Sequence, residues 1–173
     1  MMRPLFAMLV CVLVFAALVP AGARAMEINE GIGDVPYGAK CSEAFTDSDW
    51  KDAQLAPLWD DKTRELRLTY DPDIVAKSQY SVRSRLHEKL EYEDFSLITV
   101  LYLCNKKTDS FDGIIASFSI LTTPALEKRL REQFGEPDEV TPIYILWDAP
   151  DYFIQLNLNE LIVYSKKAAG QTQ

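Results

Sequence analysis

A long apolar stretch in the second half of the chain limits the folds open to it more than any other feature. Residues 95–104 (FSLITVLYLC) are rich in β-branched and aromatic side chains and are apolar at both odd and even positions. This composition is typical of a central β-strand that is buried on both faces. The polar segment 105–112 (NKKTDSFD) predicts a turn, and residues 113–121 (GIIASFSIL) predict a second strand. The two strands form a predicted hairpin.

A helix is predicted directly after this hairpin. Thr123 is the expected N-cap, and Pro124 takes the first helical position, where a backbone N–H has no helical partner in any case. The segment 135–137 (GEP) ends the helix. The apolar face recurs every four residues, at Leu126, Leu130 and Phe134.

Three further strands are predicted near the C-terminus, at residues 143–147, 152–158 and 161–164. The short polar segments 148–151 (DAPD) and 159–160 (NE) separate them and are typical of tight turns. Strands joined in this way pair with their neighbours, so the sequence predicts an antiparallel meander.

The first half of the mature chain is less clear. Leu66, Leu68 and Tyr70 alternate with charged residues and predict a short strand, and residues 41–49 predict the start of a short helix. Residues 82–92 fit one face of a helix that begins after Ser81, and they also fit the alternation of a strand. We favour the helix. The domain is then α+β, with an antiparallel sheet and one or two helices packed on one face in two layers.

The first 25 residues have the features of a secretory signal peptide. One positive charge, Arg3, precedes an unbroken apolar run at residues 5–19, and the small residues Ala23 and Ala25 predict cleavage after Ala25. The apolar run is shorter than the roughly 20 residues that span a bilayer, which disfavours the alternative of an uncleaved anchor. We expect a periplasmic or secreted protein with one domain at residues 26–165 and a flexible tail at residues 166–173.

The charge balance limits the partners. The chain holds 18 basic and 26 acidic residues, a net charge of −8, and loss of Arg3 and Arg24 with the leader makes it 16 − 26 = −10. Such a surface repels phosphate backbones and anionic headgroups, so nucleic acid and membrane surfaces are not expected as partners. Basic and neutral proteins remain compatible with it.

Two cysteines, Cys41 and Cys104, remain after cleavage. In an oxidising compartment such a pair is more often bonded than free, so we expect a disulfide. Two buried thiols, or one reactive thiol at the surface, are the alternatives. The sequence has no C-x-x-C motif, which leaves a thioredoxin-like redox role without support.

The sequence offers little catalytic chemistry. His87 is the only histidine, so a histidine-based zinc site lacks a second ligand, and no G-x-S-x-G motif accompanies it. The Asp71-x-Asp73 pair lacks the spacing of a calcium loop. We expect no catalytic residues, no metal and no cofactor. A small carboxylate-based hydrolase is one alternative, because Trp50 and Trp59 lie near acids and aromatic rings stack on sugars.

The leading hypothesis is a binding or scaffolding module of the bacterial cell envelope that acts by protein contact. Tyr144 beside Tyr152 on the open face of the meander is one candidate surface, with the edge strand as another. An alternative is an inhibitor whose acidic loop, with Asp47, Asp49 and Asp52, enters the basic cleft of a lysozyme-like hydrolase. The identity of the partner protein and the oligomeric state are left open.

A family pattern is visible in the C-terminal part. A helix ends at Phe134-Gly-Glu-Pro137, a strand carrying Trp147 follows, and two more strands complete residues 112–165, while Val35-Pro-Tyr-Gly38 lies near the start. This order resembles the small exported two-layer domains of the SmpA/OmlA outer-membrane-assembly lipoproteins, the β-lactamase-inhibitor-protein-like fold and other bacterial periplasmic proteins. The chain lacks the lipobox cysteine of the lipoproteins, and Asp148 follows Trp147 where those domains have W-x-Tyr. The resemblance implies a non-catalytic domain that works by protein contact.

Overall fold

A computed structural model describes residues 24–28, 30–32, 35–46, 50–60, 65–85 and 90–166. Nearly all of the predicted signal peptide lies outside these residues, as does the predicted tail apart from Lys166.

Strand β9 (Phe95–Asn105) is the longest strand described and lies at the centre of the sheet. One of its edges pairs with β10 (Ser110–Phe118) as the predicted hairpin. Two strands share its other edge: β7 (Tyr80–Arg85) and β8 (Leu90–Tyr92). The sheet therefore divides into two branches at β9.

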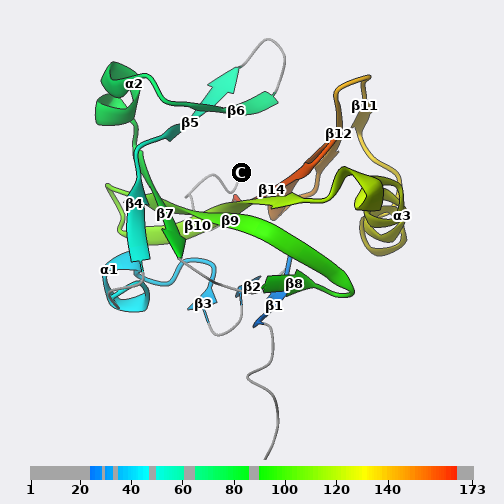
Figure 1. Ribbon diagram of the computed structural model, residues 1–173, viewed down its shortest axis with the longest axis horizontal. Helices are drawn as coiled ribbons and strands as arrows, with labels where there is room; N and C mark the ends of the chain where they lie inside the picture. The colour runs from blue at the N-terminus through cyan, green and yellow to red at the C-terminus, as the bar shows by residue number, and fades with distance from the viewer. Residues whose placement is uncertain are drawn as a thin grey trace, which may run out of the picture.

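The remaining strands extend from this centre, as Figure 1 shows. Beyond β10 the sheet continues antiparallel through β14 (Glu160–Ser165), β13 (Tyr152–Asn157), β12 (Tyr144–Asp148) and β11 (Glu139–Val140). The branch from β8 continues through β1 (Arg24–Glu27), β2 (Gly31–Ile32) and β3 (Val35–Pro36). The parallel β1–β8 pair is formed by Arg24 and Ala25, which belong to the predicted leader. The branch from β7 ends at β4 (Trp50–Ala53). A separate hairpin is formed by β5 (Ala56–Asp60) and β6 (Glu65–Thr69).

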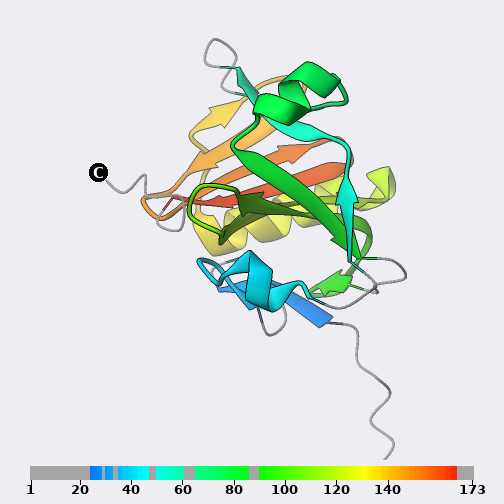
Figure 2. The same ribbon diagram turned by 90° about the vertical axis from the view of Figure 1, so that its left-hand side faces the viewer.

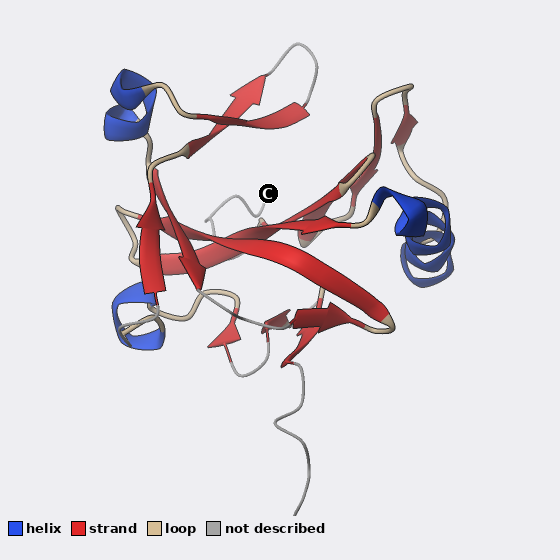
Figure 3. Cartoon of the chain, viewed as in Figure 1, coloured by secondary structure: helices blue, strands red, loops and turns tan. Residues whose placement is uncertain are grey.

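The predicted two-layer α+β fold is wrong, because the described chain is mainly β-sheet (Figure 3). Its helical part consists of α1 (Cys41–Ala44), α2 (Pro72–Lys77), α3 (Thr123–Phe134) and the 3₁₀ turn η1 (Ile120–Thr122). The main error concerns the segment predicted as a helix after Ser81, which forms β7 and β8. Val82 pairs with Leu103 and Leu90 with Leu97, so both strands are completed by hydrogen bonds to β9.

The elements predicted for the C-terminal half are present, with some boundaries corrected. β10 begins and ends three residues before the strand predicted at 113–121, and residues 120–122 form η1 instead. The N-cap of α3 is Thr122 rather than Thr123, which makes Pro124 the second helical residue.

Helix α3 begins at Thr123 and ends at Phe134, with Leu126 and Leu130 fully buried. It ends at Gly135, whose φ of 82° belongs to the left-handed region that favours glycine. The meander strands β12, β13 and β14 also match the predicted segments to within one or two residues.

Both faces of β10 and of the second half of β9 are largely buried, which explains why their sequences are apolar at odd and even positions. In the first half of β9, Ser96, Ile98 and Thr99 are exposed. On one face, Tyr102 and Ile114 belong to the larger core, which also holds Leu126 and Leu130 of α3. On the opposite face, Leu103 and its neighbours pack with Leu68 of β6 and with Leu55, the residue before β5. Figure 2 shows this arrangement from the side, with the hairpin and α2 at the top and α1 at the bottom.

Helix α1 is attached to the β9–β10 end of the sheet by covalent and polar contacts. The expected Cys41–Cys104 disulfide is confirmed and joins α1 to β9. Asp109, in the turn between β9 and β10, accepts hydrogen bonds from the backbone N–H of Ser42, at 3.1 Å, and from its hydroxyl. Because Lys40 provides no side-chain cap, Asp109 supplies the carboxyl group that the first turn of the helix requires.

Two core tyrosines differ in how their hydroxyl groups are satisfied. The Tyr92 hydroxyl donates a hydrogen bond to Gln133 Oε1 at 2.6 Å. The Tyr37 ring stacks on Phe111 with its centroid 5.1 Å away, and the buried Tyr37 hydroxyl has no hydrogen-bond partner among the described residues. Burial raises the pKa of the Tyr37 phenol, so the group stays protonated at neutral pH.

We predict that Tyr37→Phe leaves the free energy of unfolding unchanged or raises it by up to about 1 kcal/mol, because it removes a buried polar group that forms no hydrogen bond. The matched variant Tyr92→Phe should lower it by about 1 kcal/mol, because Gln133 loses its donor. Urea unfolding of both variants beside the wild type measures the difference. Equal destabilisation by the two substitutions would contradict this account of Tyr37.

Candidate functional site

Asp112 is fully buried, and no other acidic side chain is buried among those residues whose burial the structure describes. It is the extra residue of a β-bulge, because Phe111 pairs with Cys104 and Gly113 pairs with Leu103. A side chain at Gly113 would place its Cβ 2.3 Å from the Val163 carbonyl oxygen, so β10 and β14 require glycine at this point. The bulge thus places a carboxyl group inside the sheet.

Polar partners from the neighbouring strands surround this carboxyl group. Asn105 Nδ2 donates to Asp112 Oδ2 at 3.1 Å, and the Ser110 hydroxyl donates to Oδ1. The phenols of Tyr80 and Tyr164 are hydrogen-bonded to each other. Burial raises the pKa of both phenols, and the nearby Asp112 carboxyl group raises each further. Side chains from β7, β9, β10 and β14 therefore meet around one acid.

The Asp112 cluster fits a structural role better than a catalytic one. Its carboxyl oxygens accept hydrogen bonds from an amide and a hydroxyl, whereas the carboxylate-hydrolase alternative requires a second carboxyl group opposite the first. Asn105 also accepts from the backbone N–H groups of Lys107 and Thr108, at 3.0 and 3.3 Å, and so fixes the β9–β10 turn. No group of three or more potential metal ligands occurs within the described ranges.

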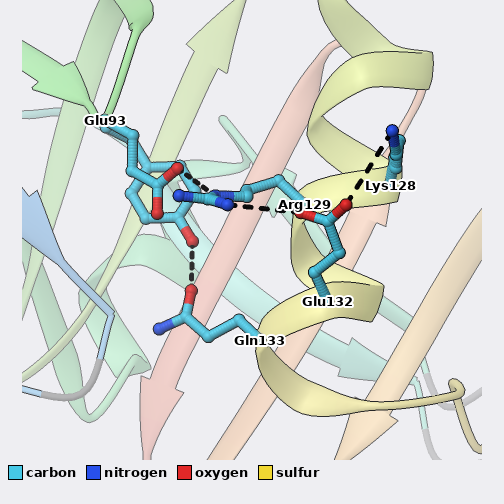
Figure 4. A network of polar contacts seen from close by, with 6 residues as sticks. Glu93, Lys128, Arg129, Glu132 and Gln133 are labelled. Atoms are coloured by element: carbon cyan, nitrogen blue, oxygen red, sulfur yellow. Dashed lines mark hydrogen bonds and ion pairs between the residues drawn. The ribbon is translucent and has the colours of Figure 1, made fainter.

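A second polar network lies at the surface, between α3 and the β8–β9 turn (Figure 4). Arg129 forms an ion pair with Glu93 and donates from Nη1 to Glu132 Oε2 at 3.2 Å. The Tyr92–Gln133 hydrogen bond runs beside it. Glu93 has a φ of 50°, which is uncommon for a residue other than glycine. The network holds α3 against the hairpin and thereby orients the segment that leads into α3.

That segment contributes to a group of exposed apolar side chains, which we name the apolar rim. Its members are between 55% and 88% exposed, although each is a large aliphatic residue. They come from η1, from the segment of β11 and the turn that follows it, and from the β13–β14 turn. The apolar rim consists of Ile120, Leu121, Val140, Ile143 and Leu158.

Hydrogen bonds and strand pairing bring these segments together at one end of the sheet. The Thr123 hydroxyl donates to the carbonyl oxygens of both Ile120 and Leu158, so η1 lies against the β13–β14 turn. Tyr144 pairs with Asn157, which places Ile143 opposite Leu158. The rim is therefore one surface built from three parts of the chain.

The segments that form the rim carry no charge, in a chain of which 25% of the residues are charged. Residues 113–126, 140–147 and 152–159 contain no Asp, Glu, Lys or Arg. Charged residues are depleted from the centres of protein interfaces, and clustered apolar side chains on a surface are typical of interaction sites. The arrangement is that of a protein-contact surface.

The structure does not bring the predicted tyrosine surface together. Tyr144 is buried with Leu146 and Phe153, and its hydroxyl donates to Glu139 Oε1 at 2.7 Å. Tyr152 packs against the opposite core, beside Tyr37. Tyr144 pairs with Asn157 of β13, and paired residues share a face of the sheet. Tyr152 is an odd number of residues before Asn157, and side chains along a strand alternate between the two faces, so Tyr144 and Tyr152 face opposite sides.

The predicted acidic loop lies mostly outside the described residues. Asp47 and Asp49 fall in that part of the chain, as does His87. Asp52 is described: it lies on β4, and one of its carboxyl oxygens is 3.4 Å from Nε of Arg83.

Comparisons of this chain with protein-family models, with curated proteins and with solved structures found no match. The resemblance to small exported envelope domains thus remains a prediction from the residues that carry it. Among the described helices, none has the length and apolar character needed to cross a membrane.

The apolar rim is not predicted from the sequence, although part of its signal is visible. Leu121 and Leu158 each end a predicted strand, where a paired rather than an exposed residue is expected, and both lie beyond the ends of β10 and β13. The signal that identifies the rim is the absence of charge from three separate segments that border turns. Their proximity follows only from the strand pairing.

We predict that Asp112→Ala lowers the free energy of unfolding by about 2–4 kcal/mol, because buried donors on Asn105 and Ser110 lose their acceptor. The control Asp52→Ala should change it by less than about 1 kcal/mol, since it removes an exposed ion pair. Urea denaturation of the two variants provides the test. Equal, small effects would show that the Asp112 cluster does not join the strands as described.

Proposed function

We propose that this chain is an exported, non-catalytic binding module of the bacterial cell envelope that contacts a partner protein through the apolar rim. The observation that carries the proposal is the set of five exposed aliphatic side chains on charge-free segments at one end of the sheet. Full burial of one Leu or Ile side chain stabilises a contact by about 1.5–3 kcal/mol. Burial of several such side chains against one partner contributes several kcal/mol, from which the cost of association is subtracted.

The proposed contact uses side chains rather than addition of a strand. The edge strand β11 lies next to the rim, but it is two residues long and has Pro137 and Pro142 close to its ends. Short strands and prolines at an edge oppose pairing with another chain. The edge-strand form of the hypothesis is therefore less favoured than contact through the rim.

The proposal of export rests on the leader and the disulfide. The A-x-A pattern at residues 23–25 predicts cleavage, and the Cys41–Cys104 bond is of a kind that persists in oxidising compartments. Net negative charge keeps such a domain soluble and repels anionic surfaces. A protein partner in the envelope is consistent with the leader, the disulfide and the negative charge.

Site-specific photocrosslinking in the cells that make the protein tests the function. A benzophenone amino acid replaces Leu121 or Leu158 in the rim, and Tyr70, which is 75% exposed outside the rim, serves as the control position. We expect one discrete protein adduct from both rim positions and none from position 70. Adducts of equal yield from all three positions, or none from the rim, would contradict the proposal.

A further inference from the structure

The shape of the apolar rim restricts what it can contact. Leu121 is 88% exposed, and a side chain exposed to this degree stands away from its neighbours. The other members lie on or beside turns at the end of the sheet, where the chain reverses direction. Leu121 therefore projects from the surface, and a projecting apolar side chain is buried most completely by a concave partner surface.

Acidic residues border the rim on one side. Glu139 precedes Val140 and is held in place by the Tyr144 hydroxyl, and Glu160 follows the turn that carries Leu158. Glu139 pairs with Leu146 in the ladder, and Glu160 lies two residues before Ile162. Both glutamates therefore lie on the face of the sheet opposite α3, in a chain whose net charge is −8.

We propose that the partner presents a concave apolar cleft bordered by Lys or Arg side chains, an inference that rests on the proposed function of the rim. The apolar centre of the cleft covers Leu121 and Leu158, and its basic border meets Glu139 and Glu160. A second copy of this chain fits less well, because it presents the same projecting Leu121 and the same acidic border, and the two acidic borders repel each other.

Three β-cyclodextrins provide matched concave apolar probes: one neutral, one with primary amines and one with carboxymethyl groups. Each is titrated into the ¹⁵N-labelled protein while the amide resonances of the rim are followed. We expect all three to shift rim resonances, with the cationic form binding roughly tenfold more tightly than the anionic form, a difference of about 1.4 kcal/mol. The preference should weaken with added salt.

Two double variants separate local charge from net charge. Glu139→Gln with Glu160→Gln should abolish the preference for the cationic probe, while binding of the neutral probe remains. Glu43→Gln with Glu91→Gln removes the same charge from α1 and β8, away from the rim, and should preserve the preference.

The outcomes distinguish the two proposals. Equal affinity for cationic and anionic probes would overturn the basic border and leave the function of the rim intact. The absence of rim shifts with every probe would overturn both. Dimerisation in sedimentation measurements that Leu121→Ser abolishes would show that a second copy covers the rim, and would overturn the concave basic partner.

Discussion

The pairing of β9 with strands on both of its edges is the constraint on which the rest of the structure depends. Its eleven residues receive β10 along one edge and β7 and β8 along the other. The disulfide from Cys104 attaches α1 to the same strand. The bulge that buries Asp112 is defined by the register between β9 and β10. Both cores and the polar cluster are thus arranged around one strand.

The apolar rim follows from how this sheet ends. β10 leads through η1 into α3, and the Thr123 hydroxyl joins η1 to the β13–β14 turn. The Arg129–Glu93 ion pair holds α3 against the hairpin that begins β9. Because the ends of β10, β13 and β12 lie in register, the side chains beyond them are brought onto one surface. The charge-free sequence of that surface is what gives it the character of a contact site.

The sequence predicts those elements whose signal is local. The apolar run of β9 and the Thr-Pro start and Gly end of α3 specify their structures within a few residues. Residues 80–92 are different: their apolar spacing satisfies two periods, and the choice is made by hydrogen bonds to β9, far along the chain. The candidate site could not be predicted for the same reason, because it depends on contacts between residues far apart in the chain. Exposure of Leu121 and burial of Tyr144 depend on strand pairing and on which face each residue takes, and no local pattern contains that information.

The central claim, that the β9 ladder organises the fold, is tested most directly by native-state hydrogen exchange. The account predicts that amides paired between β9 and β10 exchange only through global unfolding, with one shared free energy of opening. Amides of the separate β5–β6 hairpin should exchange through smaller, local openings. Exchange of the β9–β10 amides as fast as those of the hairpin would contradict the claim.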